Sequence, residues 1–458
     1  MNVSAVVGGT VITPDGPVRA DVLIAGGKVA AVGEHRPGAG RPLDASGCWV
    51  LPGGVDPHCH LMAGIAQATS AAARGGTTTA LSFTSPAPGE SAVESLERGR
   101  SELERYGAAI DVGLHAAIYD PARVSHEDLA AARRAGAAAV KIFLAYPELG
   151  IMCSTRRLFE IMSSAKRLGL LVQVHCENGT LIEALEASAL NAEADSPVRA
   201  GPRIFADTRP PEVEEEAVAS TLAAAALAGA PCYLVHLSTA GALEQVRLAR
   251  RRGQPPVFVE TCLHHLLLDD SCYSSDEAAR YLVCPPLRAR HHVEAMWDGL
   301  AAGTIDAVGS DHCQAKTLTS GRLAAAGYKY AYGLAGIGPR LPLLLSAARR
   351  RDLSAGRIVQ LAAENAARAF GHYPRKGALL AGSDADIVIF DPDGETVLPG
   401  DGLGDGTGDS VYAGRAADGR IRDVLLRGQL IVSGGVLVDA EPGGQFLPVE
   451  ARFAQPGG

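Results

Sequence analysis

The sequence predicts an α/β protein: a (β/α)8 barrel of the TIM type with a small β-sandwich domain formed from both chain ends. The middle of the chain alternates short apolar strands with helical segments rich in Ala, Leu and Glu, which is typical of a parallel sheet. The two ends contain short strands and glycine turns. Because neither end can bury a core alone, we expect the two ends to fold together.

The opening stretch reads as four short strands, at 5–7, 10–12, 21–24 and 28–32. β character returns after Arg375, at 386–390, 424–428 and 430–432, with a Gly- and Asp-rich loop at 399–419. The predicted boundaries are 1–52 and 376–441 for a discontinuous β-sandwich domain, 53–375 for the barrel and 442–458 for an extended tail.

Eight apolar segments supply the predicted barrel strands. The first is the segment 48–51, which leads through a Pro-Gly-Gly break toward two histidines. The others end in polar or small residues and lie at 77–83, 111–116, 139–144, 171–175, 232–236, 257–261 and 305–309. Eight such repeats with helices between them predict a closed barrel.

Composition narrows the class of protein. The chain has 458 residues, of which 47% are hydrophobic and 20% charged, as is ordinary for a globular protein. Its formal net charge of -9 argues against a nucleic-acid or anionic-membrane partner. Neither a secretory signal nor an uninterrupted membrane-spanning stretch is visible. The nine cysteines are scattered, which predicts reduced thiols and a cytoplasmic location.

His58 and His60 are separated by one residue at the end of a strand. Alternate side chains of a strand point to the same face, so both imidazoles can reach one point. Two imidazoles at one point are a common way to hold a divalent metal. The alternative is a pair of surface histidines at a strand end.

Polar residues at the other predicted strand ends extend this pattern, because barrel active sites lie at the carboxyl ends of the strands. His58, His60 and Asp311 can hold one metal, and His175 and His236 a second. Lys141 is a poor ligand as an ammonium ion, but a neutral amine can react with CO2 to form a carbamate that bridges both ions. The predicted ligands are therefore His58, His60, Lys141, His175, His236 and Asp311.

Each of these residues has an ordinary alternative. A histidine on a strand is often a hydrogen-bonded core residue, Lys141 can form a salt bridge at the barrel rim, and Asp311 can cap a helix. Their joint occurrence at strand ends favours the metal site. Four further histidines lie in loops or beyond strand ends and are assigned no metal role: His264, His265, His291 and His292.

Motifs along nearly the whole chain resemble one family. The chain is similar to the cyclic amidohydrolases of the hydantoinase and dihydropyrimidinase family, within the amidohydrolase superfamily. The segments that carry this resemblance are PGGVDPHCHL (52–61), VKIFLAY (140–146), VQVHCENG (172–179), RPPE (209–212), YLVHLS (233–238), PPLR (285–288), GSDH (309–312), GHYPRKG (371–377) and GSDAD (382–386).

The resemblance implies hydrolysis of a C–N bond in a cyclic amide, ureide or imide. It also implies two zinc-like ions, a bridging hydroxide, a CO2-derived carbamate on Lys141 and a homo-oligomer, tetramer or dimer. Asp311 would pass a proton to the leaving nitrogen, and Tyr146 would donate to the developing oxyanion. The substrate contacts implied in this way are Tyr146, Cys284, Tyr332 and Gly333.

Three departures from the family pattern concern the substrate. The stretch after His60 is short, Cys284 stands where the family has serine, and the segment 332–340 lacks the family's asparagine. A wide, apolar entrance lined by Leu61, Met62 and Ile65 is therefore expected, unless Tyr332 or the loop 316–327 fills it. Bulky or aromatic substituents would suit such an entrance. Two alternatives stay open: hydrolysis of a linear or N-acyl amide, and a non-catalytic assembly protein.

Overall fold

The structure is a computed structural model that describes residues 2–34, 40–61, 64–193, 202–313, 316–317, 331–406, 408, 410–438 and 443–449. Its centre is an eight-stranded parallel sheet with the strand order β15-β14-β13-β12-β11-β10-β9-β8. The strands are β8 (Gly54–Cys59), β9 (Thr77–Phe83), β10 (Asp111–Ala117), β11 (Val140–Phe143), β12 (Val172–His175), β13 (Cys232–Leu234), β14 (Val257–Cys262) and β15 (Ala307–Gly309).

The first and last strands of this sheet also meet. The backbone N–H of Asp311 donates to the carbonyl of His58 at 2.9 Å, and that of His60 donates to His312 at 2.7 Å. These bonds close the sheet just beyond the end of β15. The predicted barrel is confirmed.

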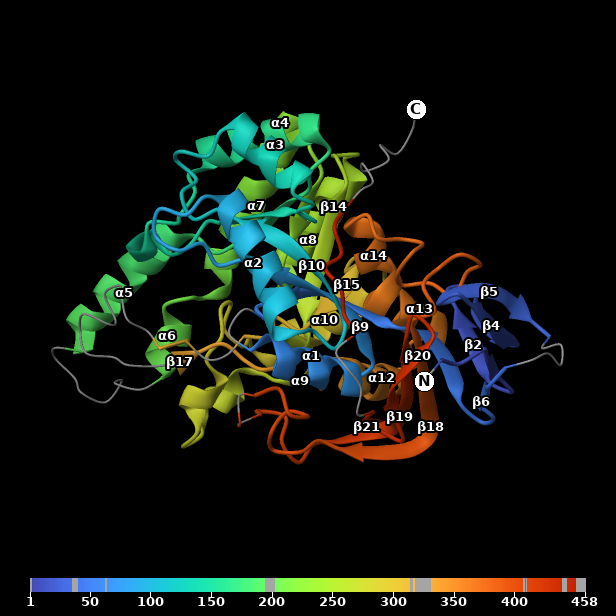
Figure 1. The fold of residues 1–458 in the computed structure, drawn as a ribbon. Helices are drawn as coiled ribbons and strands as arrows, with labels where there is room; N and C mark the ends of the chain where they lie inside the picture. Colours follow the sequence, from blue (N-terminus) through green and yellow to red (C-terminus); the bar gives the residue numbers. More distant parts are fainter. Residues whose placement is uncertain are drawn as a thin grey trace.

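Helices surround the barrel strands (Figure 1). Side-chain caps fix where several begin: Ser91 and Glu94 form a capping box at the start of α2, and Ser125 and Asp128 do the same for α3. The helices are α1 (Ile65–Arg74), α2 (Ala92–Tyr106), α3 (His126–Arg134), α4 (Thr155–Leu168), α5 (Gly179–Glu193), α6 (Arg203–Asp207), α7 (Pro211–Ala228), α8 (Ala240–Arg251), α9 (Leu263–Leu267), α10 (Arg290–Ala301), α12 (Arg340–Arg349), α13 (Ala355–Val359) and α14 (Asn365–Ala369). Within the described residues, no helix combines the length and apolar character needed to cross a membrane.

Two further sheets come from the chain ends and lie together at one side of the barrel (Figure 1). A four-stranded sheet contains β5 (Lys28–Gly33), β4 (Asp21–Ala25), β1 (Ala5–Val7) and β6 (Pro42–Asp44). A seven-stranded sheet contains β21 (Val436–Leu437), β20 (Gln429–Ser433), β19 (Ala416–Leu426), β18 (Ile387–Val397), β7 (Trp49–Pro52), β2 (Thr10–Thr13) and β3 (Gly16–Arg19). Both sheets contribute to one apolar core, to which Val6, Val22, Ile387 and Leu425 belong.

The expected first barrel strand requires a correction. The apolar segment 48–51 belongs to β7, which pairs with β18 and β2 in the seven-stranded sheet, and the barrel starts at Gly54. Gly53 makes the turn between the two sheets, where an added Cβ would lie 2.0 Å from Oγ1 of Thr78. The Pro-Gly-Gly break is therefore the point at which the chain passes from one sheet to the other.

A buried network of ion pairs joins the amino-terminal end of the barrel strands to the seven-stranded sheet. Nζ of Lys376 lies 2.6 Å from Asp111 at the start of β10, 2.7 Å from Asp386 and 2.9 Å from Asp384. All four side chains are buried. Because a buried ammonium must be paired to be tolerated, this network fixes how the two sheets meet.

The described part of the tail runs beside β10. The N–H of Val112 donates to the carbonyl of Gln445 at 2.9 Å, and the N–H of Leu447 donates to Val112 at 2.8 Å. The segment 443–449 thus runs along the first residues of β10, at the end of the barrel where the strands begin.

Candidate active site

His58, His60 and Asp311 meet at the seam where the barrel closes. Nε2 of His58 lies 3.0 Å from Oδ1 of Asp311, and Nε2 of His60 lies 3.4 Å from the same oxygen. The backbone bonds between the ends of β8 and β15 produce this convergence. Asp56 adds to it, because its buried carboxylate accepts the N–H of Ser310 at 3.0 Å.

Glu260, on β14, fixes the orientation of His58. Its Oε1 lies 2.7 Å from Nδ1 of His58, so that nitrogen carries a proton and Nε2 is the ring nitrogen that points at Asp311. Gly309 makes room for the pair, since an added Cβ would lie 2.9 Å from Oε1 of Glu260. Glu260 is not among the predicted site residues, although an acidic residue inside an apolar strand is a visible signal in the sequence.

His175 and His236 form a second group beside the first. Nε2 of His236 lies 2.9 Å from Nδ1 of His175, while Nε2 of His175 lies 2.8 Å from Glu177. Glu177 therefore holds the His175 proton on Nε2 and leaves Nδ1 free to accept or to ligate. The His58 and His236 rings are 5.4 Å apart between centroids, so the two groups adjoin.

Lys141 projects from β11 and is 2% exposed. Its Nζ lies 4.8 Å from the centroid of the Phe83 ring and 5.4 Å from that of Phe143. Burial lowers the pKa of Lys141 to about 8. No carboxylate among the described residues lies within ion-pair distance of it, so the rim salt bridge considered from the sequence is absent there.

Tyr146 follows β11 and faces the second group. Its ring centroid lies 5.1 Å from that of His175. Burial, with Cys284 and Tyr332 nearby, raises the pKa of Tyr146 well above its ordinary value, so the hydroxyl stays protonated. Cys284 is buried. The N–H of Gly333 donates to Leu282 at 2.8 Å, which leaves the carbonyl as the backbone group that Gly333 can offer a substrate.

Three of these residues have backbone conformations that L-residues rarely adopt. The φ angles are 64° at Tyr146, 38° at His236 and 45° at Asp311. Such conformations cost free energy and concentrate where a side chain must be aimed at a functional site. For Asp311 the conformation also rules out the helix-cap alternative, since the described residues after it do not continue as a helix.

The donor atoms fit divalent metal ions. Ligand atoms of His58, His60 and Asp311 all lie within 4.8 Å of one another. Imidazole and carboxylate together suit zinc and similar ions. The facing nitrogens of His175 and His236 supply a second pair of ligands, and a carboxylated Lys141 would add an oxygen between the groups.

The prediction that Leu61 and Ile65 line an apolar entrance is wrong. Leu61 is 1% exposed and Ile65 is 3% exposed, and both belong to the main core. Met62 and most of the loop 316–327 lie outside the described residues. A partly exposed row of rings stands near the site instead: the Phe143 centroid lies 6.0 Å from that of Tyr146 and 6.0 Å from that of Tyr119.

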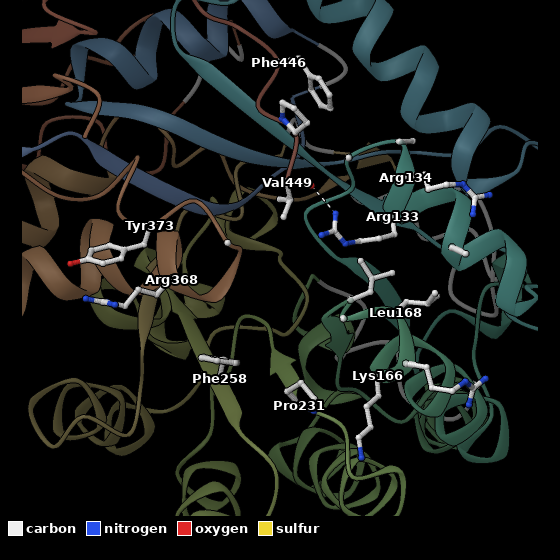
Figure 2. A pocket seen from close by; sticks show the side chains of 18 of the residues that line it. Arg133, Arg134, Lys166, Leu168, Pro231, Phe258, Arg368, Tyr373, Phe446 and Val449 are labelled. Carbon is white, nitrogen blue, oxygen red and sulfur yellow. Dashed lines mark hydrogen bonds between the residues drawn. The ribbon is translucent and has the colours of Figure 1, made fainter. Parts of the chain in front are cut away.

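A separate cavity of about 2120 Å³ lies at the opposite, amino-terminal end of the strands (Figure 2). Phe446 and Val449 of the tail line it, together with Lys166, Pro231 and Phe258. None of the predicted metal ligands lines it. We therefore place the chemistry at the carboxyl ends of the strands, where the titratable side chains converge.

Comparison with known proteins agrees with this geometry. Residues 49–431 match the family described as "Amidohydrolase family". A D-hydantoinase of Ralstonia pickettii is 34% identical over 453 residues, which cover 96% of this chain and 97% of the relative. A D-hydantoinase of Rhizobium radiobacter is 35% identical over 452 residues. The crystal structure of dihydropyrimidinase from Brevibacillus agri has a TM-score of 0.90 and 33% identity, and the match covers 99% of this chain and 100% of that one.

Proposed function

The chain belongs to the amidohydrolase family, in its hydantoinase and dihydropyrimidinase branch, and we propose that it is a binuclear metal hydrolase that opens a C–N bond of a cyclic amide, ureide or imide. One observation carries the proposal: two groups of ligand atoms adjoin at the carboxyl end of the barrel, with Lys141 buried beside them.

His58, His60 and Asp311 would hold one ion, and His175 and His236 the other. When bound, the two ions would lower the pKa of a water so that hydroxide is available near neutral pH, and they would polarise the amide carbonyl. Glu260 and Glu177 each accept a hydrogen bond from one ring nitrogen of His58 and His175, so the other nitrogen of each ring is the one that would bind an ion.

Lys141 would serve both ions as a carbamate. Its amine attacks CO2, forms an N–C bond and releases one proton, which yields a carboxylate at the end of the side chain. The surroundings favour this product, because an ammonium buried beside Phe83 and Phe143 forms no ion pair with a described carboxylate.

Asp311 and Tyr146 would act on the substrate. Asp311 lies beside His58 and His60 and is the carboxylate that can accept a proton and deliver it to the leaving nitrogen. The Tyr146 hydroxyl, held protonated, can donate a hydrogen bond to the carbonyl oxygen as negative charge develops there.

The row formed by Tyr119, Phe143 and Tyr146 favours a ring-bearing substituent on the substrate. Phe143 is partly exposed, and its centroid lies 5.9 Å from that of His175. An aryl group placed beside the row would gain edge or offset contacts, which an unsubstituted ring such as dihydrouracil lacks.

The remaining parts of the proposal rest on the resemblance and on the donor set. We propose zinc as the metal, a tetramer or dimer as the working form and the cytoplasm as its location. We also propose that 1–52 with 376–441 and 53–375 are the two folding units, with 442–458 as a tail.

A metal-loaded hydrolysis screen tests the function. The purified protein is analysed for metal and assayed on hydantoins, dihydropyrimidines, cyclic imides and N-acyl amino acids. We expect about two ions per chain and ring opening of the cyclic substrates. Asp311→Asn should reduce the rate on the order of 10²–10⁴-fold. A folded protein that takes up no metal in metal-supplemented medium, or that acts only on N-acyl amino acids, would overturn the proposal.

A further inference from the structure

Cys262 and His264 lie close to Asp311 and have no part in the proposed chemistry. Cys262 ends β14 and His264 lies on α9, and both side chains are fully buried. One ligand atom from each, with a carboxylate oxygen of Asp311, falls within 4.8 Å of the others. The thiol of Cys262 and the imidazole of His264 therefore lie close to the carboxylate of Asp311.

His264 is the unusual member of this set. Neither of its ring nitrogens has a hydrogen-bond partner among the residues that the structure describes, although both are buried. A buried polar atom without a partner costs free energy. A neutral imidazole in this position offers the lone pair of one ring nitrogen. This is the state in which histidine ligates a metal.

A second candidate set of ligand atoms, from His58, Glu260 and Cys262, includes the same thiol. There the imidazole nitrogen and the carboxylate are already bonded to each other at 2.7 Å, and Tyr233 donates to the other carboxylate oxygen at 2.9 Å. The thiol of Cys262 lies 3.7 Å from Glu260. Cys262 can therefore turn to a new ligand set without breaking a strong bond, whereas Glu260 cannot.

We propose that Cys262, His264 and Asp311 form a third position for a soft divalent ion such as Zn²⁺ or Cd²⁺, filled when that ion is in excess. Sulfur, nitrogen and oxygen in one set favour such ions over Mg²⁺ or Ca²⁺. Around a tetrahedral zinc the ligand atoms lie about 3.3–3.8 Å apart. The set must therefore contract slightly, so we expect binding weaker than at the main centre.

Occupation of this position would inhibit hydrolysis. The ion replaces the thiol proton of Cys262, which leaves to solvent, and binds a carboxylate oxygen of Asp311. This consequence rests on the proposed function, in which Asp311 carries a proton between nucleophile and leaving group. Once that oxygen is bound to the ion, it is no longer available for the transfer.

The test titrates Cd²⁺ into the zinc-loaded protein. Cadmium bound to a thiolate absorbs in the ultraviolet, so binding is seen without an activity assay. We expect a thiolate band in the wild type together with loss of hydrolysis that a mild chelator reverses. Cys262→Ser should remove the band. In both Cys262→Ser and His264→Gln the inhibition constant should rise about tenfold or more, with hydrolysis in the absence of Cd²⁺ close to wild type.

Cys176→Ser is the matched control, since Cys176 is also buried and adjoins the predicted ligand His175 but bonds to Thr221. It should keep both band and inhibition. A wild-type band that survives in Cys262→Ser, or equal inhibition in all four proteins, would overturn the proposal. His264→Gln decides the case if Cys262→Ser does not fold. A protein without hydrolytic activity would refute the proposed function, while the absorbance titration would still decide whether the third position exists.

Discussion

Glu260 accepts a hydrogen bond from Nδ1 of His58 at 2.7 Å through one carboxylate oxygen and from the Tyr233 hydroxyl at 2.9 Å through the other. The backbone N–H of His236 also lies 3.3 Å from the first oxygen. One buried carboxylate thus contacts residues from both proposed ligand groups. Its role is to position them, since its own oxygens are occupied by these donors.

Replacement of Glu260 should weaken metal binding without abolishing the fold. In Glu260→Gln the amide oxygen can take only one of the two carboxylate oxygen positions, so His58 loses its fixed tautomer or Tyr233 loses its partner. We expect metal affinity to fall about 10–100-fold, measured by competition with a chromophoric chelator. Glu244→Gln, an exposed change on α8, is the control. Equal affinity in Glu260→Gln and wild type would show that His58 does not need this carboxylate.

Lys141 provides the second prediction. Lys141→Ala should lose activity by about 10²-fold or more, because a bridging ligand should matter at least as much as an outer hydrogen-bond partner. Short-chain carboxylates such as acetate or propionate should restore part of the rate by entering the space that the side chain leaves. Lys166→Ala, an exposed lysine at the other end of the barrel (Figure 2), should have no effect. Wild-type rate and metal content in Lys141→Ala would refute the carbamate bridge.

The barrel was predictable because strand ends are marked in the sequence by polar residues after apolar runs. The same rule identifies His58, His175 and His236 as site residues, because the carboxyl ends of the parallel strands lie at the same end of the barrel. The first strand is misplaced in the prediction because 48–51 is the apolar run nearest to His58 and His60, whereas the barrel strand 54–59 contains Asp56 and Pro57 and carries no apolar pattern. Which of them pairs with β18 depends on a partner more than 300 residues away, as the pairing of Val50 with Ile389 shows.

The rule based on strand ends does not identify residues that act by orienting another residue. Glu260 and Glu177 lie inside segments whose apolar pattern and motif drew attention to their neighbours, and their roles follow only from distances to imidazole nitrogens. The entrance residues Leu61 and Ile65 were misjudged for a related reason. Sequence proximity to His60 does not determine the direction in which a side chain points, and both turn into the core.

The ring row gives a prediction on substrate preference. Phe143→Ala should reduce kcat/KM for a 5-aryl hydantoin by about 2- to 12-fold, which corresponds to the loss of about 0.5–1.5 kcal/mol of aromatic contact. The value for unsubstituted hydantoin should change little, which separates lost aryl contact from a disturbed Lys141. Phe159→Ala, on the exposed face of α4, serves as control. A clear wild-type preference for dihydrouracil would mean that other residues close the pocket.

The last prediction concerns stability in acid. Asp384 is buried and accepts from Lys376 at 2.9 Å, from Arg375 at 3.0 Å and from Lys28. Burial alone would raise the pKa of Asp384, but these cations outweigh it and lower the pKa to about 2. A carboxyl group with a lowered pKa stabilises the fold above its unfolded value near 4, and that contribution disappears as the pH falls toward 2.

The shift corresponds to about 2 kcal/mol at neutral pH. Burial raises the pKa of neighbouring Asp386, whose protonation in acid offsets part of this loss. In urea unfolding of the metal-free protein, wild type should therefore lose more stability between pH 5 and pH 3 than Asp384→Asn does. Asp15→Asn, in an exposed turn, should follow the wild type. Parallel pH profiles for wild type and Asp384→Asn would mean that the network around Lys376 is held by Asp111 and Asp386 alone.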